Sequence, residues 1–95
     1  MIILINESTE AEEYLLDLSN VNYQGYVPLV AQGLTGAEKI DISFSIKGTT
    51  FENLKVDGEL KKLTAQNNAV ILNAGLFYKF SKTVTVNPVT LAVRK

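Results

Sequence analysis

The chain has 95 residues, of which 46% are hydrophobic and 20% charged, a length that predicts one domain and a composition that excludes intrinsic disorder. It contains no Cys, His or Trp, so thiolate chemistry is excluded and the commonest general base and transition-metal ligand are missing. A net charge of −1 argues against a general nucleic-acid-binding surface.

The N-terminal segment begins with an apolar run over residues 1–5, which is too short for a signal peptide or a membrane span. A loop over residues 7–13 and a strand over residues 14–18 are predicted to follow. A short helix is the alternative, because Thr9 and Glu12 fit a capping box. An isolated helix of this length is marginal, which favours the strand.

The middle of the chain carries the strongest strand pattern. A strand is predicted around residues 27–31, with Pro28 at a sheet edge or at the start of the strand, because proline cannot donate to a ladder. Residues 33–36 predict a turn. Residues 38–47 then alternate apolar and polar side chains, which indicates a half-buried strand. The apolar members are Ile40, Ile42, Phe44 and Ile46.

Turn residues divide the rest of the chain into short strands. Residues 47–50 predict a turn, residues 51–56 a returning strand with an irregularity near Asn53, and Asp57-Gly58 a tight turn. Further strands are predicted at residues 60–64, 69–72, 76–86 and 89–94. This regular spacing predicts an all-β fold, namely a single small antiparallel β-sandwich or barrel of about 7–8 short strands.

The charges divide unevenly along the sequence. Up to residue 38 the chain has six acidic residues and no Lys or Arg, giving −6; from residue 39 it has nine basic and four acidic residues, giving +5. The acidic residues of the first part are Glu7, Glu10, Glu12, Glu13, Asp17 and Glu38. One prediction is that the acidic part of one copy meets the basic part of another head to tail; the alternative is that both parts are simply solvated.

No residue pattern predicts a catalytic, cofactor-binding or metal site. Asp57 and Glu59 come nearest to a carboxylate pair, but they flank a Gly turn and lack further oxygen ligands at calcium-loop spacing. No Gly-x-Ser-x-Gly motif is present, and the His that such a serine would need is missing. We therefore expect a protein that is not an enzyme and uses no cofactor.

Two sets of side chains are candidates for binding. The first is a group of lysines around Phe51, a pattern that suits a single nucleic-acid strand, although lysines on exposed turns more often protect strand edges, which is the favoured interpretation. These lysines are Lys47, Lys55, Lys61 and Lys62. The second set suits stacking on sugars or packing against a partner. It consists of Tyr14, Tyr23 and Tyr26.

Five motifs follow one another over residues 32–80. They read Gly33-Leu34-Thr35-Gly36-Ala37-Glu38, Gly48-Thr49-Thr50-Phe51, Asp57-Gly58, Leu63-Thr64-Ala65-Gln66-Asn67-Asn68 and Gly75-Leu76-Phe77-Tyr78-Lys79. In this order they resemble small phage structural proteins of the head-decoration or virion-associated type. The chain departs from that pattern at Phe51, where Trp is common, and at Ala74-Gly75, where Pro-Gly is common.

The resemblance implies a β-sandwich attached to a capsid or tail, with no cofactor, as a homo-oligomer in which a trimer is favoured. We therefore expect a non-enzymatic virion protein that is made in the host cytoplasm and contacts itself and a capsid or other virion protein. We expect neither a membrane nor nucleic acid as a partner. A β-sandwich module that binds a carbohydrate or a host surface is the alternative.

Overall fold

Eleven short strands and no helix occur in the residues that this computed structural model describes, 2–19 and 25–94. The strands are β1 (Ile2–Ser8), β2 (Glu12–Asp17), β3 (Tyr26–Gln32), β4 (Lys39–Ser45), β5 (Glu52–Asn53), β6 (Lys55–Val56), β7 (Glu59–Leu60), β8 (Lys62–Thr64), β9 (Ala69–Asn73), β10 (Phe77–Lys82) and β11 (Val89–Val93). Their number exceeds the prediction mainly because residues 51–64, predicted as two strands, divide into four.

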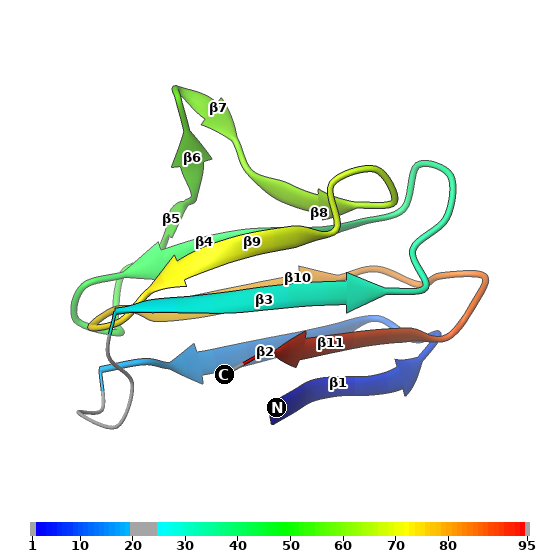
Figure 1. The fold of residues 1–95 in the computed structure, drawn as a ribbon, viewed down its shortest axis with the longest axis horizontal. Helices are drawn as coiled ribbons and strands as arrows, with labels where there is room; N and C mark the ends of the chain where they lie inside the picture. The colour runs from blue at the N-terminus through cyan, green and yellow to red at the C-terminus, as the bar shows by residue number, and fades with distance from the viewer. Residues whose placement is uncertain (1, 20–24, 95) are drawn as a thin grey trace.

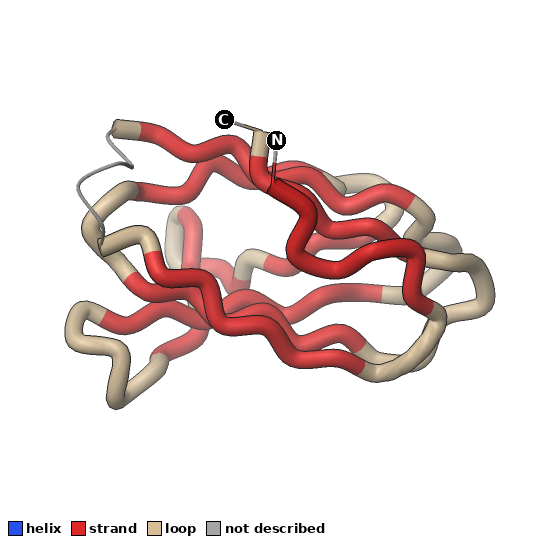
Figure 2. Tube along the Cα trace, turned by 90° about the horizontal axis from the view of Figure 1, so that it is seen from below, coloured by secondary structure: helices blue, strands red, loops and turns tan. Residues whose placement is uncertain are grey.

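The strands form two antiparallel sheets that pack face to face (Figures 1 and 2). Sheet A has the order β1-β11-β3-β9, and sheet B has the order β2-β10-β4-β5, with β8 also paired to β4. Within the described residues neither sheet closes on itself. The predicted small all-β fold is therefore confirmed, as a sandwich rather than a barrel.

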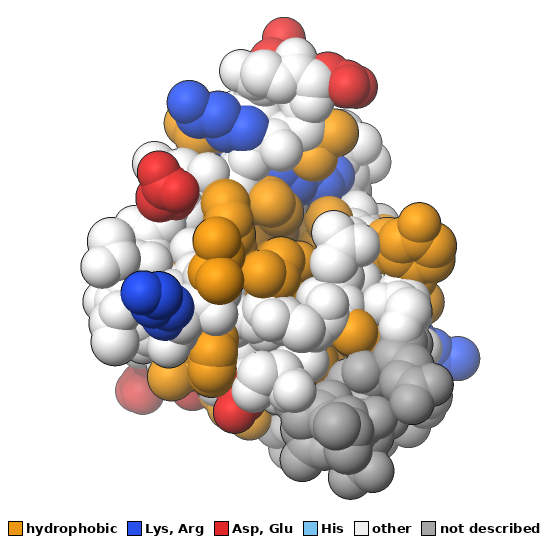
Figure 3. Space-filling model, turned by 90° about the vertical axis from the view of Figure 1, so that its left-hand side faces the viewer, with side chains coloured by type: hydrophobic (Ala, Val, Ile, Leu, Met, Phe, Trp, Pro, Cys, Tyr) orange, Lys and Arg blue, Asp and Glu red, His pale blue; other side chains and the backbone are white. Residues whose placement is uncertain are grey.

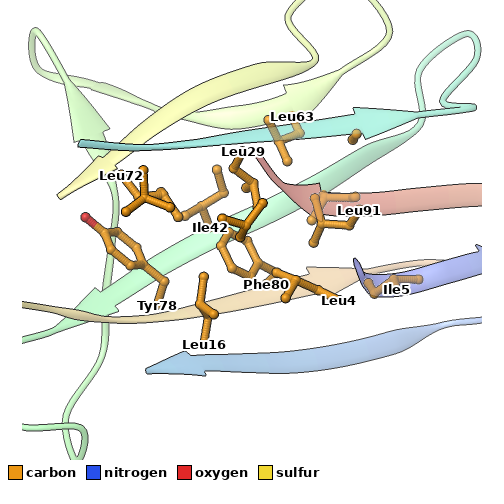
Figure 4. Close-up of a cluster of buried hydrophobic side chains, with 14 of the residues drawn as sticks. Leu4, Ile5, Leu16, Leu29, Ile42, Leu63, Leu72, Tyr78, Phe80 and Leu91 are labelled. Atoms are coloured by element: carbon orange, nitrogen blue, oxygen red, sulfur yellow. The ribbon is translucent and has the colours of Figure 1, made fainter. Parts of the chain in front are cut away.

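Both sheets turn apolar side chains inward, because successive residues of a strand point to opposite faces. Figure 4 shows the two sets meeting in one core. Sheet A contributes Leu4, Ile5, Leu29, Leu72 and Leu91, and sheet B contributes Leu16, Ile42, Leu63, Tyr78 and Phe80. The rings of Tyr78 and Phe80 stack with their centroids 6.4 Å apart. The inward side of β10 therefore lies at the centre of the core.

Most predicted strands are confirmed, but the alternating run at residues 38–47 ends earlier than predicted. β4 stops at Ser45, whose Oγ accepts the N–H of Gly48 at 2.8 Å. The chain therefore turns before Ile46 can join the sheet, and the Ile46 side chain is 75% exposed. Its predicted place on the buried side of the strand is wrong.

The strand predicted over residues 76–86 ends at Lys82. Val84 and Val86 are 71% and 82% exposed. The N–H of Val86 donates to the carboxylate of Glu38 at 2.7 Å instead of to a neighbouring strand. The end of the predicted strand is therefore a loop, held by a side chain that is distant in sequence.

Pro28 lies in an interior strand, so the prediction of a sheet edge or a strand start is wrong. β3 has β11 on one side and β9 on the other, and Pro28 is its third residue. The Pro28 carbonyl accepts the N–H of Arg94 at 2.8 Å, beyond the last ladder pair of β11, Val93 with Leu29. Pro28 therefore lies just beyond the last residue pair between β3 and β11, so no pair of this ladder loses a hydrogen bond through the N–H that proline lacks.

The loop predicted over residues 7–13 is shorter, because only residues 9–11 separate β1 from β2. Glu7 has a φ of 45° where the register of β1 against β11 shifts, and its N–H donates to Thr90 Oγ1 at 3.1 Å. This bulge keeps the polar end of β1 attached to sheet A. The alternative of a short helix is wrong, and the strand predicted over residues 14–18 is confirmed as β2.

Residues 55–60, which we name the arm, project from the sandwich as a two-stranded hairpin (Figure 1). The returning strand predicted over residues 51–56 pairs with β4 only along the two residues of β5 and then leaves the sheet. β6 pairs instead with β7 across Asp57 and Gly58. Their φ angles of 54° and 83° match a two-residue hairpin turn, so the predicted tight turn is confirmed.

Candidate interaction surfaces

The outer face of sheet A is apolar across all four strands. One row across the sheet consists of Ile3, Ala92, Val30 and Ala69. The next row places Pro28 opposite Ile71, and Tyr26 follows along β3. Ile3, Ile71 and Tyr26 are 47%, 63% and 74% exposed. We name these seven residues the sheet A face.

Polar residues border the sheet A face. A hollow of about 280 Å³ lies between Ile3, Val30 and Ala92, since alanine is smaller than the side chains beside it. Its lining is completed by Gln32, Thr90 and Arg94. An apolar patch with a polar border is the usual arrangement at protein–protein interfaces. This face is therefore a candidate for contact with another protein.

The outer face of sheet B is mainly polar and charged, with Leu15 and Phe77 as its apolar members. One row across it consists of Glu13, Ser81, Asp41 and Lys62, and another of Leu15, Lys79, Ser43 and Asn53. Asp41 also pairs with Lys39, whose Nζ lies 2.9 Å from its Oδ2. Charges of both signs occur together here, as on a solvated surface. The two outer faces thus differ in kind.

The four lysines predicted around Phe51 do not form one site with its ring. The cation nearest to that ring is on Lys79, whose Nζ lies 4.7 Å from the ring centroid. Lys61 and Lys62 line one hollow at the base of the arm, and the other two lysines line separate hollows. The arrangement predicted for a single nucleic-acid strand is therefore not formed.

The predicted tyrosines are also separated. Tyr26 is exposed on the sheet A face, whereas Tyr14 is half-buried and packs against the core. Tyr23 lies outside the described residues. Of the two tyrosines that the structure describes, Tyr26 is therefore the one exposed for stacking on a ligand or partner.

A second hollow, of about 240 Å³, opens at one end of the sandwich. Its lining is Phe44, Ser45, Ile46, Lys47, Thr49, Thr50 and Glu52. Figure 3 faces this end and shows apolar side chains gathered below the arm. Apolar walls beside hydroxyl groups and a charge of each sign suit a small polar ligand.

At the opposite end of the sandwich, Lys82 is buried. The Lys82 side chain is 3% exposed, and its Nζ donates to the carbonyls of Glu10 at 2.6 Å and Thr83 at 3.1 Å. These bonds satisfy a buried cation and join the loop before β2 to the loop after β10. The sequence analysis missed this residue, although it shares the inward alternation of Tyr78 and Phe80.

Glu38 holds a third loop at the same end. Its carboxylate accepts the N–H of Val86 at 2.7 Å and the N–H of Thr35 at 2.9 Å. These hydrogen bonds, that from Val86 first, lower the pKa of the Glu38 carboxyl below its usual value. Glu38 therefore closes the end of the sandwich rather than acting as an ordinary surface acid.

Asp57 and Glu59, the nearest approach to a carboxylate pair in the sequence, lie at the tip of the arm. Within residues 2–19 and 25–94, no group of three or more acidic side chains is placed to hold a metal ion. No helix in this part of the chain is long and apolar enough to cross a membrane.

A scan against protein-family models found no family that matches the chain, and searches of curated proteins and of solved structures found no similar protein. The resemblance to phage structural proteins therefore stays a prediction from the sequence motifs.

Proposed function

We propose that the protein is a non-enzymatic structural subunit of a phage virion. It stabilises a capsid or another head-associated structure through protein–protein contacts. The observation that carries the proposal is the sheet A face, an apolar surface that spans four strands and has a polar border. The phage context comes from the motif order, and the need for a protein partner comes from this face.

The physical argument is the free energy of burying the exposed apolar side chains. Transfer of apolar surface from water contributes about 25 cal/mol per Å², and Ile3, Ile71 and Tyr26 each keep a large part of their surface exposed. A partner that covers the seven apolar residues gains this energy, and the charged side chain bordering them is that of Arg94. The same partner would gain less on sheet B, because Glu13, Asp41 and Lys62 would have to be desolvated.

Fractionation of phage particles tests the proposal. We expect the chain to sediment with the particles made by its source genome, and Ile3→Lys to remain in the unbound fraction. Leu15→Lys is the matched control, since Leu15 is 54% exposed on the outer face of sheet B, and it should still sediment. A wild-type chain that never sediments with particles contradicts the proposal.

A carbohydrate- or host-surface-binding module is the second candidate. The observation that favours it is the end hollow, where Phe44 and Ile46 lie beside the hydroxyls of Thr49 and Thr50. A glycan array probed with the folded chain would separate the two functions. Binding that is lost in Thr49→Ala/Thr50→Ala supports the module, and a blank array removes it.

A further inference from the structure

We propose that β9 pairs antiparallel with β9 of a second copy of this chain, so that two four-stranded A sheets join into one continuous sheet. In the symmetric register Ile71 lies opposite Ile71 of the second copy, and Ala69 lies opposite Asn73. The inference rests on the proposed function as a virion subunit that acts through protein–protein contacts, and it deepens that function by naming one contact surface and a second copy as its partner.

The hydrogen bonds of β9 show which of its backbone groups face outward. On the side of β3, the carbonyl of Asn68 accepts the N–H of Ala31 at 2.8 Å, and the N–H of Ala74 donates to Gly25 at 3.0 Å. Backbone groups of successive strand residues point to opposite sides. Residues 68, 70, 72 and 74 therefore face β3, and residues 69, 71 and 73 face the edge.

Tyr78 confirms this alternation from the other side. Its hydroxyl, which comes from sheet B, accepts the N–H of Asn73 at 3.0 Å. In the described part of the chain, β9 pairs with β3 alone. The N–H and C=O of Ala69 and Ile71, together with the Asn73 carbonyl, are thus directed toward an incoming strand.

The other sheet edges carry features that prevent such pairing. β2 has three acidic residues among six, Glu12, Glu13 and Asp17. β1 is bulged at Glu7, and β5 and β8 have only two and three residues. Charges, bulges and short length are the usual protections of an edge strand. β9 has five residues in unbroken register and none of these protections.

The β9 edge is uncharged, which suits a second copy of the same strand. β9 reads Ala-Val-Ile-Leu-Asn and contains no ionisable side chain, so two copies meet without like-charge repulsion. Ile71 is 63% exposed and would pack against its symmetry equivalent, a β-branched pair of the kind that stabilises neighbouring strands. A charged partner strand would gain no counter-charge here.

The arm supplies additional contact on the same side of the sandwich. It rises beyond the edge formed by β9 and β5 (Figure 1), and its Val56 and Leu60 are 50% and 52% exposed. A two-stranded hairpin is marginal by itself. A stable interface covers about 800 Å² on each partner, more than a pair of five-residue strands provides, so the arm completes the interface by covering the second copy.

Light scattering after size exclusion tests the pairing with the full chain. Over about 1 µM to 1 mM, the range expected for a small interface, the mass should rise from 10.4 kDa to twice that value. Ile71→Lys should keep the single-chain mass, because two ammonium groups would oppose each other. Leu15→Lys, which adds the same charge to the edge of sheet B, should behave as the wild type.

A cysteine variant tests the register without weakening the contact. The chain has no cysteine, so oxidised Ile71→Cys should give one disulfide-linked pair on a non-reducing gel, and Leu15→Cys should not. The proposal is overturned by a wild type that stays single at about 1 mM, by a three-chain mass, by an Ile71→Lys mass equal to the wild type, or by equal cross-linking of both cysteines. Pairing without particle sedimentation would overturn the proposed function alone, and sedimentation of a chain that does not pair would overturn this inference alone.

Discussion

The strands β2 and β9 are both sheet edges, and both expose an aliphatic side chain to a similar degree. Leu15 of β2 is 54% exposed and Ile71 of β9 is 63% exposed. They differ in charge, since β2 carries Glu12, Glu13 and Asp17 and β9 carries none. Apolar exposure therefore does not identify an adhesive edge by itself; the absence of charge beside it does.

The same strand anchors both edges from inside. β10 turns Tyr78 and Lys82 inward near its two ends. The Tyr78 hydroxyl accepts a hydrogen bond from Asn73 at the end of β9, and Lys82 Nζ donates one to Glu10 just before β2. The two edges can therefore be disturbed separately by changing one side chain of β10.

The largest expected effect is the conversion of β2 into a second adhesive edge. In the triple variant Glu12→Thr, Glu13→Thr and Asp17→Thr, the repulsion between two copies of β2 disappears while strand propensity is kept. We expect masses above two chains by light scattering at high concentration, because each copy then has two pairing edges. A triple variant that never exceeds the wild-type mass would show that charge is not what protects β2.

Loss of the buried cation should have the largest effect on folding stability. Lys82→Met leaves the carbonyls of Glu10 and Thr83 without their donor and should lower the free energy of unfolding by about 1–3 kcal/mol. Denaturant unfolding measures this. Lys79→Met, on the outward side of the same strand, is the control and should cost less. Equal losses in both variants would contradict the anchoring role of Lys82.

Removal of the Tyr78 hydroxyl should cost about 1 kcal/mol, because the N–H of Asn73 loses its acceptor. Burial raises the pKa of Tyr78 above its usual value of 10.0. The hydrogen bond from Asn73 acts in the opposite direction, so it is burial of the ring that disfavours its ionised form in the folded state. Burial of the neutral ring therefore stabilises the folded chain fully below pH 10, and this stabilisation is lost as the pH rises through the folded pKa. The free energy of unfolding should therefore fall less above pH 10 in Tyr78→Phe than in the wild type. An equal dependence on pH in the two proteins would contradict this role of Tyr78.

The smallest effect is expected at Glu38, which belongs to neither edge strand. The carboxyl has a pKa below 4.5 in the folded chain, so its stabilising contribution is present above pH 4.5 and is lost as the pH falls through the lowered value. Glu38→Gln should remove this acid-dependent part of the unfolding free energy. An unchanged acid limb in Glu38→Gln would show that the bonds to Val86 and Thr35 do not matter for stability.

Local patterns predicted the sandwich because alternation and turn chemistry both operate within a few residues. The strand at residues 38–47 and the Asp57-Gly58 turn are confirmed as β4 and the turn of the arm. The same alternation misplaced Ile46 and Val86, since Ser45 and Glu38 divert those segments through hydrogen bonds that no short window contains.

The candidate surfaces were harder to predict, because they depend on which strands become neighbours. Ile3, Val30 and Ala92 lie far apart in sequence and meet only through the register of sheet A. The isolation of β9 at an edge likewise follows from the strand order and not from its own sequence. One signal was present beforehand: residues 69–73 contain no charge in a chain in which 20% of residues are charged.

Backbone amide exchange of β9 tests the central claim most directly. At low concentration the Ile71 N–H should exchange quickly, while the N–H groups of Val70 and Leu72, which face β3, should be protected. On concentration the protection of Ile71 should rise in proportion to the paired fraction, and Leu15→Lys should not alter this rise. Fast exchange of Ile71 at every concentration, in a chain whose mass nevertheless doubles, would place the contact elsewhere and contradict the account.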